Sequence, residues 1–306
     1  MRRHLRSLSV QLLAISGRCR LAALSLILLL AACQQQPYHL ESHPSPNQDS
    51  RIDFLILHYT DEDNAGSLLA LTSPERQVSA HYLVPAGSHQ QPYPILQLVP
   101  DEQRAWHAGV SRWRGTPSLN ATSLGIEIVN GGYAEKDAAL PLDQRHWQPF
   151  EAAQLAAVGA LARDLVTRYH LRPTHVLGHS DVAPERKVDP GPLFPWQRLH
   201  DEFGVGAWPD EARVQAWLAA PFPRSAGPWQ QALARYGYGV EQTGEWDNMT
   251  HQVLRAFQLH FRPARYDGEP DQESWARLNA LLERYVPSWH GPLLDTPREE
   301  TPNEAP

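Results

Sequence analysis

The stretch I-D-F-L-I-L-H-Y at residues 52–59 decides the fold. Its interior is almost wholly apolar and rich in branched aliphatic residues, which is typical of a β-strand in a protein core. Similar runs predict further strands at residues 78–84, 95–99, 125–130 and 175–178. Apolar side chains recur at helical spacing between residues 148 and 169, which predicts the main helix. This order of elements indicates an α/β fold, with a mixed central sheet and flanking helices.

Polar side chains interrupt the apolar pattern in two further stretches, L-G-I-E-I-V-N at residues 124–130 and V-L-G-H-S-D-V-A-P-E-R-K-V-D-P-G at residues 176–191. His58 and His179 each follow an apolar run, where a histidine is ordinarily a core residue whose nitrogens bond to the backbone. Ten residues after His179, Asp189 lies in a proline-flanked loop that could fold back over the same edge. Two imidazoles and one carboxylate leave the fourth position of a tetrahedral zinc site open, as hydrolysis requires.

Glu127 stands between Ile126 and Ile128 in an apolar strand. A carboxylate in that position is costly to bury unless it bonds to a partner or has a function. Partial burial would raise the pKa of Glu127 toward the value that a general base needs at neutral pH. Lys187 could stabilise an oxyanion, or it could be a solvated loop lysine. These two residues are therefore candidates for catalysis beside a metal.

The three stretches resemble the zinc-dependent N-acetylmuramoyl-L-alanine amidases, which share a fold with the peptidoglycan-recognition proteins. The resemblance implies that His58, His179 and Asp189 bind one Zn²⁺ ion. It also implies that Glu127 acts on the water at the metal and that Lys187 stabilises the oxyanion. The amidase and peptidoglycan-recognition fold is therefore the expected architecture.

The reaction that this resemblance implies is hydrolysis of an amide in peptidoglycan turnover. The amide joins the lactyl group of N-acetylmuramic acid, in its intact or anhydro form, to L-alanine of the stem peptide. Peptidoglycan and muropeptides are therefore the expected partners, and no protein partner is implied. Tyr59, Trp106 and His107 are expected to line the substrate cleft, where an aromatic ring can pack on a sugar face.

Two other functions remain open on the residues alone. A muropeptide-binding lipoprotein without catalysis would use the same fold, although such relatives typically lose a zinc ligand and none is lost here. A zinc peptidase could instead cut within the stem peptide, but the sequence has no H-E-x-x-H motif of the thermolysin type. His175 is not expected to join His179 on one metal, because four residues of strand would separate them by about 13 Å.

Residues 1–32 are expected to be a lipoprotein signal peptide. Arginines precede an apolar run at residues 21–30, which is too short to span a bilayer comfortably. The sequence L-A-A-C at residues 30–33 is typical of a lipobox, which makes Cys33 the expected site of acyl chains such as palmitate; an ordinary cleavage site beside a free thiol is the alternative. Gln34 favours sorting to the outer membrane, so we expect a periplasmic protein anchored there through Cys33.

The chain carries a formal net charge of −7 at pH 7. Residues 1–32 contain five arginines and no acidic residue, so their removal would change the charge to −12, with 22 basic residues against 34 acidic ones. A nucleic-acid partner is not expected, because phosphate binding requires a basic face. Cys19 would be removed as well, which leaves Cys33 without a partner for a disulfide.

Composition divides the chain after residue 32 into five parts. They are a tether at residues 33–50, a zinc amidase catalytic domain at residues 51–205, a connector at residues 206–226, a helical domain at residues 227–287 and a disordered tail at residues 288–306. The connector is expected to be structured, because it contains a short amphipathic stretch at residues 211–220.

Three helices are expected in the helical domain, at residues 229–236, 250–261 and 271–285. Two copies of G-E-x-D-x-x-[ST], at residues 244–250 and 268–274, lead into the second and third helices, and each aspartate can cap a helix. The pattern resembles the small peptidoglycan-binding domain attached to many wall hydrolases. A structural cap on the catalytic domain would produce the same helical stripes. Deleting a pure binding domain would leave the catalytic domain intact, whereas deleting a cap would expose apolar surface.

Overall fold

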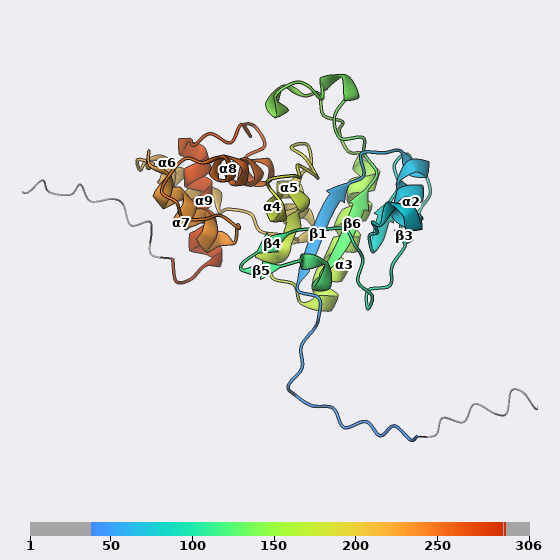
Figure 1. Ribbon diagram of the computed structural model, residues 1–306. Coiled ribbons are helices and arrows are strands. Elements are labelled where there is room, and N and C mark those ends of the chain that lie inside the picture. Colours follow the sequence, from blue (N-terminus) through green and yellow to red (C-terminus); the bar gives the residue numbers. More distant parts are fainter. Residues whose placement is uncertain (1–37, 290, 292–306) are drawn as a thin grey trace, which may run out of the picture. The chain divides into compact units, whose positions relative to one another are not determined.

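The structure is a computed structural model that describes residues 38–289 and residue 291 (Figure 1). The expected signal peptide, Cys33 and most of the expected tail lie outside these residues. The described chain divides into two units, with the boundary between Asp49 and Ser50. Residues 38–49 are exposed and form no helix or strand. None of the described helices is both long enough and apolar enough to cross a bilayer.

A five-stranded mixed sheet lies at the centre of the second unit, in the order β3-β2-β6-β1-β7. Its strands are β1 (Phe54–Tyr59), β2 (Tyr82–Val84), β3 (Leu96–Gln97), β6 (Ser123–Ile128) and β7 (Val176–Gly178). β3 runs antiparallel to β2, and the other neighbouring strands are parallel. Residues 54–57 are all buried, as expected for a strand in a sheet that is covered on both faces. The predicted mixed sheet is confirmed.

The register of the parallel strands determines which polar residues meet at one edge of the sheet. His58 lies opposite Glu127 in the β1–β6 pair. Leu57 lies opposite Gly178 in the β1–β7 pair, so His179 follows directly at the same edge. The carboxyl ends of parallel strands share an edge, and ligands of open α/β sheets bind there. The strand order therefore places two histidines and one glutamate at that edge.

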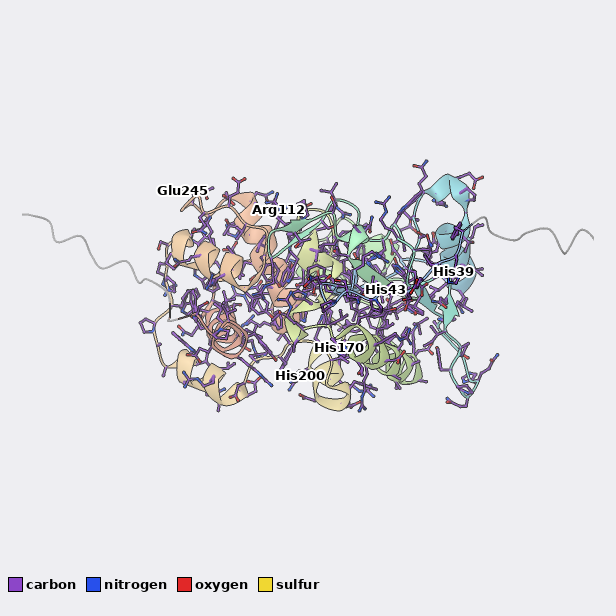
Figure 2. The ribbon with its side chains drawn as sticks, turned by 90° about the horizontal axis from the view of Figure 1, so that it is seen from below. His39, His43, Arg112, His170, His200 and Glu245 are labelled. Atoms are coloured by element: carbon purple, nitrogen blue, oxygen red, sulfur yellow. The ribbon has the colours of Figure 1, made fainter. Side chains whose placement is uncertain are left out.

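Four helices accompany the sheet, namely α2 (Asn64–Thr72), α3 (Ala152–Tyr169), α4 (His179–Val182) and α5 (Trp196–Phe203). α3 is the main helix expected from residue 148 onward, but it begins four residues later. The later start of the helix has a local cause. The backbone N–H of Gln148 donates to the carbonyl of Gly132 (2.7 Å), which holds Gln148 in a loop. α3 ends at Tyr169, and its C-cap residue His170, labelled in Figure 2, has a left-handed φ of 53°.

The helical region comprises α6 (Glu211–Leu218), α7 (Ala226–Tyr236), α8 (Asn248–Phe261) and α9 (Gln272–Tyr285). The last three are the helices expected from the sequence, and each begins within three residues of its expected start. α6 lies in the expected connector and packs against α9. There Arg213 donates to both carboxylate oxygens of Glu283 (2.7 and 2.8 Å). The predicted C-terminal group of helices is confirmed, and the helix of the connector packs as part of it.

The two G-E-x-D-x-x-[ST] copies form matching helix starts. The Asp247 side chain accepts from the backbone N–H of Thr250 at 2.8 Å, and Asp271 accepts from that of Ser274 at 2.8 Å. Each aspartate therefore satisfies one of the backbone donors that a helix leaves free at its first turn. The predicted caps are confirmed.

A buried glutamine holds the glycine that begins each copy. The side-chain oxygen of Gln230 accepts from the backbone N–H of Gly244, and that of Gln258 accepts from Gly268, both at 2.8 Å. The side-chain nitrogen of each glutamine donates to the carbonyl of the glutamate that follows the glycine, at 2.9 Å in both cases. We call these two arrangements the glutamine clamps. They make the weak sequence repeat a structural repeat.

One hydrophobic core runs from the sheet into the helical region. The hairpin of β4 (Arg112–Trp113) and β5 (Thr116–Pro117) forms part of this contact. Trp113 is fully buried, and its ring lies edge-on to the rings of Tyr236 (5.9 Å) and Tyr238 (4.8 Å). The helical region thus packs on this hairpin and on α4 and α5, as a structural cap does.

Deletion of residues 227–287 is therefore expected to lower the melting temperature of the remaining chain by about 10 °C or more. Trp113 would lose its buried contacts, and removing the partners of a large aromatic side chain costs about 3–5 kcal/mol. Scanning calorimetry of the full-length and shortened chains measures the effect. An unchanged melting temperature would show that the helical region is an independent module.

Candidate metal centre

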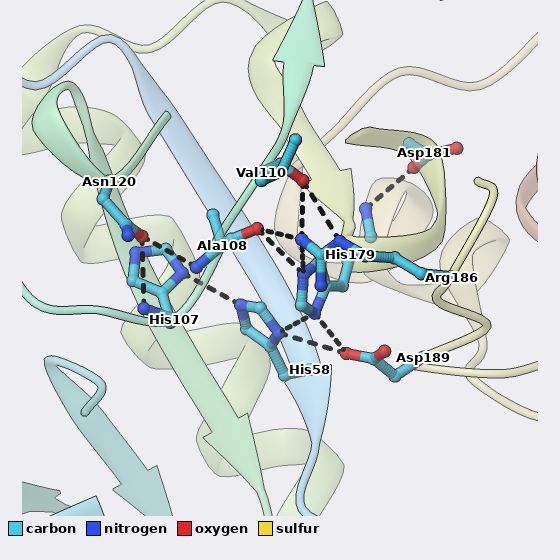
Figure 3. Close-up of polar contacts among 10 residues, drawn as sticks. His58, His107, Ala108, Val110, Asn120, His179, Asp181, Arg186 and Asp189 are labelled. Carbon is cyan, nitrogen blue, oxygen red and sulfur yellow. Dashed lines mark hydrogen bonds and ion pairs between the residues drawn. The ribbon is translucent and has the colours of Figure 1, made fainter. Parts of the chain in front are cut away.

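Three residues with metal-binding side chains meet at the carboxyl edge of the sheet (Figure 3). The Nδ1 atoms of His58 and His179 are 2.9 Å apart, and both lie 3.1 Å from Oδ2 of Asp189. All three side chains are buried. These are the three residues that the sequence suggested as zinc ligands.

The local fold explains why residues so far apart in the sequence come together. His58 is at the end of β1, and His179 follows β7 as the first residue of α4. The loop after α4 returns to the same edge, because the backbone N–H of Ser180 donates to the carbonyl of Asp189 (2.9 Å). The N–H of Lys187 donates to the carbonyl of Ala183 (3.0 Å), which tightens the loop further.

A chain of hydrogen bonds fixes the orientation of His58. It begins at the hydroxyl of Ser123, which donates to the carbonyl of Leu119 (2.7 Å) and so accepts from Nε2 of His107 (3.2 Å). Nδ1 of His107 then carries a lone pair and accepts from Nε2 of His58 (3.0 Å). The remaining nitrogen of His58, Nδ1, therefore presents a lone pair to Asp189 and His179.

His179 is oriented in the same way. Its Nε2 lies 3.2 Å from the carbonyl of Ala108 and 3.3 Å from a guanidinium nitrogen of Arg186. Donation of the ring N–H to the shorter contact, the carbonyl of Ala108, leaves the lone pair on Nδ1. Two imidazole lone pairs and a carboxylate oxygen thus face one another, an arrangement that a cation stabilises. With zinc bonds of about 2.0–2.1 Å, tetrahedral ligands lie about 3.3 Å apart, so the observed separations fit one zinc ion.

The pKa values of these groups follow from their burial and their mutual contacts. Burial, together with the nearby charge of His179, lowers the pKa of His58 to about 4. Burial alone would raise the pKa of Asp189, but the neighbouring imidazoles of His179 and His58 outweigh it and hold this pKa below its usual value. At neutral pH the site therefore offers a neutral imidazole and a carboxylate, the forms that bind metals.

Glu127 lies on β6 beside His58 and lines the cavity at the metal centre. Burial, and secondarily the charge of Asp189, raises the pKa of Glu127 well above its ordinary value. Its Oε2 atom is enclosed and has no hydrogen-bond partner among the described residues. A carboxyl group with a raised pKa and a free oxygen is suited to exchanging protons near neutral pH.

A cavity of about 350 Å³ opens at the metal centre. It is lined by Tyr59, Trp106, His107, Glu127 and Lys187 together with the three metal-binding residues. Every site residue suggested by the sequence within the described chain therefore lies at this cavity. Trp106 is half exposed at its edge, whereas His107 is buried behind His58. That these aromatic rings contact substrate stays a prediction.

His81 and His175 lie outside the ligand set, as expected for His175. His175 ends a short 3₁₀ turn, where its Nδ1 donates to the carbonyl of Asp53 (2.7 Å) and its ring stacks on Phe54. His81 accepts from the backbone N–H of Gly125 through Nδ1 (3.0 Å). Both are buried histidines: His81 bonds to the backbone through both ring nitrogens, and His175 does so through Nδ1.

Sequence reasoning missed two residues of the site. Arg186 lines the cavity and donates to the carbonyls of Ala108 and Val110, which ties the loop after α4 to the segment before β4 (Figure 3). Ser123 anchors the hydrogen-bond chain behind His58. Arg186 stands next to Lys187 in the sequence, which is the only signal that could have found it. The role of Ser123 depends on its hydrogen bonds to His107 and Leu119, which cannot be predicted from the residues around Ser123 in the sequence.

The sheet edge, the histidine and aspartate ligand set and the adjacent carboxyl group define a metal-dependent hydrolase. Residues 48–192 match the family model described as N-acetylmuramoyl-L-alanine amidase. The chain is 44% identical over 275 residues to N-acetylmuramoyl-L-alanine amidase AmiD of Escherichia coli K12, covering 84% of this chain and 95% of that protein. The chain belongs to the N-acetylmuramoyl-L-alanine amidase family, whose members are zinc-dependent.

Solved structures agree with this assignment. The structure of E. coli AmiD in complex with anhydro-N-acetylmuramic acid-L-Ala-D-γ-Glu-L-Lys has a TM-score of 0.73 and 43% identity, covering 82% of this chain and 97% of that chain. AmpDh3 from Pseudomonas aeruginosa has a TM-score of 0.71 and 39% identity, covering 82% and 99%. Residues 229–278 also match a model described as a peptidoglycan binding domain. The expected amidase fold is therefore confirmed.

Proposed function

We propose that this chain hydrolyses the amide between the lactyl group of N-acetylmuramic acid, intact or anhydro, and L-alanine of the stem peptide. The observation that carries the proposal is the convergence of the three metal-binding residues with Glu127 and Lys187 at one cavity. The similarity to AmiD, whose structure holds an anhydromuramyl peptide, supports this substrate class. The process served is peptidoglycan turnover.

His58, His179 and Asp189 hold the zinc ion in this proposal. Zinc, when bound, polarises the scissile carbonyl and lowers the pKa of water to about 7. Glu127 takes the proton of the attacking water and delivers it to the departing amine of L-alanine. Lys187 stabilises the carbonyl oxygen as negative charge develops on it. Tyr59 and Trp106 form the walls against which the sugar and peptide are oriented, and His107, predicted to bind substrate, holds His58 from behind.

Replacement of Lys187 by alanine is expected to lower kcat by about 10²–10³ and to change KM much less, because a charge that acts on the oxyanion acts in the transition state. Steady-state kinetics on a soluble muropeptide measure both constants. Lys136→Ala is the matched control, since Lys136 lies in the turn Glu135–Asp137 and does not line the cavity. Equal kcat values for the two variants would remove Lys187 from the mechanism.

Digestion of purified murein by the chain without its first 34 residues tests the proposed reaction. The expected products are glycan strands with free lactyl carboxylates and stem peptides that begin with a free L-alanine amine, as mass spectrometry can identify. A chelator should stop their formation and added zinc should restore it. New termini within the stem peptide would indicate a zinc peptidase instead. Binding of muropeptides without any new termini would indicate a recognition protein.

We also propose that acyl chains on Cys33 anchor the protein to the periplasmic side of the outer membrane. The supporting features are the apolar run before L-A-A-C and the Gln34 that follows it. Cys33→Ser is expected to move the protein from the membrane fraction to the soluble fraction of the periplasm. A wild-type protein found in the soluble fraction would contradict the anchor.

For the helical domain, proposed at residues 227–287, we infer a second contact with peptidoglycan. The match of residues 229–278 to a peptidoglycan binding domain supports this inference. Full-length Glu127→Gln protein should sediment with insoluble murein, because a second contact raises the avidity for a polymer. Tyr266→Ala, a change in the turn before α9, should reduce the sedimented fraction. Sedimentation no greater than that of an unrelated acidic protein would contradict the contact.

A further inference from the structure

Asp181 is a buried carboxylate that the proposed reaction does not use. It lies on α4, and its Oδ2 accepts from the backbone N–H of Gly178 (2.8 Å) and from Nδ1 of His260 (2.7 Å). Its Oδ1 accepts from the hydroxyl of Tyr238 (2.6 Å). His260 is on α8, and Tyr238 follows α7. Two of the three donors to this carboxylate therefore come from the helical region.

α4 is the element that connects Asp181 to the metal centre. His179 is its first residue, and Gly178 is its N-cap. The N–H of Ser180 holds the carbonyl of Asp189. An isolated helix of four residues is not stable, because its nucleation costs more than its few hydrogen bonds return. The position of α4, and with it that of His179, is therefore set by contacts outside the helix.

His260 also contacts the surroundings of the metal centre indirectly, through the ring of Trp196. Its imidazole lies 3.7 Å from the ring centroid of Trp196, with an angle of 19° between the planes. Trp196 in turn covers Gly178, where an added Cβ would meet Pro190 at 2.8 Å and Trp196 at 3.3 Å. Pro190 follows Asp189 directly. The start of α4 is therefore enclosed between the loop that carries Asp189 and the ring against which His260 packs.

A buried carboxylate is costly to leave without partners, so separating Asp181 from its two donors in the helical region is unfavourable. The side chain of Asp181 is 1% exposed, and that of His260 is 2% exposed, so water cannot replace either donor without opening this contact. The hydrogen bonds of Asp181 thus link the helical region to α4. The backbone of α4 carries His179 and, through the N–H of Ser180, holds Asp189.

We propose that Tyr238 and His260 are positioning residues for the metal centre, acting through Asp181 on the helix that begins with His179. The helical region then has two tasks, contact with the wall polymer and support of the catalytic metal site. This inference rests on the proposed zinc site and concerns its regulation by the second domain.

Cobalt substitution of the full-length chain tests the proposal, because the visible spectrum of Co²⁺ reports the geometry of its ligands. Tyr238→Phe removes one hydroxyl and His260→Phe keeps the stacked ring. Each is expected to change the Co²⁺ spectrum and to weaken zinc binding about tenfold in competition with a chelator, the lower end of the effect of a lost supporting hydrogen bond. The isosteric Tyr238→Phe keeps the test decisive if His260→Phe fails to fold.

Gln258→Met is the matched control. Gln258 is fully buried on the same helix as His260, but its side chain bonds to the turn before α9 and to Ser274 in the first turn of α9, and not to Asp181. This variant should lower the melting temperature while leaving the Co²⁺ spectrum and the zinc affinity unchanged. It therefore separates loss of stability in the helical region from loss of support for the metal centre.

The outcomes distinguish this inference from the proposed function. Unchanged spectra and zinc affinities in Tyr238→Phe and His260→Phe would overturn the positioning role, as would equal changes in Gln258→Met. A wild-type chain that binds neither cobalt nor zinc would overturn the proposed zinc site itself, and the positioning role with it. Changes confined to the two variants that contact Asp181 would establish the role.

Discussion

Replacement of His179 by alanine is expected to leave a folded chain with almost no bound zinc and no measurable amidase activity. Two protein ligands would remain, whereas catalytic zinc sites use three. The buried carboxylate of Asp189 would also lose the imidazole that lies 3.1 Å away and helps to keep its pKa below the usual value. Because metal binding contributes to folding, the variant should melt at a lower temperature than the zinc-loaded wild type.

Elemental analysis of the purified variant measures this effect, and His175→Ala is its matched control. His175 lies in the same segment and is equally buried, but it bonds to Asp53 and not to the ligand set. It should therefore lose stability and keep stoichiometric zinc. Zinc retained by His179→Ala and lost by His175→Ala would reverse the assignment of the ligand.

Replacement of Glu127 by glutamine is expected to keep the zinc and to lower kcat by about 10²–10⁴, the range for a positioned acid or base. Glutamine has the same shape but cannot take up a proton. The variant should be at least as stable as the wild type, because Oε2 of Glu127 has no hydrogen-bond partner among the described residues and burial disfavours its charge.

Zinc content, melting temperature and turnover of a soluble muropeptide, measured on the same preparation, check this expectation. Near-normal turnover would show that Glu127 is not the proton carrier. Loss of zinc would instead indicate that Glu127 supports the ligand set. Low turnover combined with full metal content and unchanged stability is the result that assigns the proton transfers to this carboxyl group.

Much of the metal centre could be predicted from the sequence, because apolar runs indicate buried strands. The polar residues at the ends of these runs indicate which side chains lie at the carboxyl edge of the sheet. The run before His58 is fully buried as β1, and the run before His179 is β7. Parallel pairing then brings these ends together, and Glu127 with them. The capping aspartates of the helical region were predictable for the same local reason, since a cap bonds within its own turn.

Features that depend on distant partners could not be predicted in this way. The strand expected from residue 78 begins only at Tyr82, because the N–H of Ser79 donates to the carbonyl of Trp106 outside the ladder. The buried position of His107, expected at the surface of the cleft, follows from its bond to His58. Helical stripes in the C-terminal part likewise indicated burial without indicating that α4, α5 and the β4–β5 hairpin supply part of the covering surface.

The glutamine clamps have a consequence for how this chain can vary. The backbone at Gly244 and Gly268 is held from inside by Gln230 and Gln258, and Thr243 in the first turn adds a side-chain bond to Gln230. Selection can therefore exchange the other residues that face solvent in either turn without disrupting the helices behind them. The same scaffold can acquire new preferences for wall chemistry by small steps, one turn at a time.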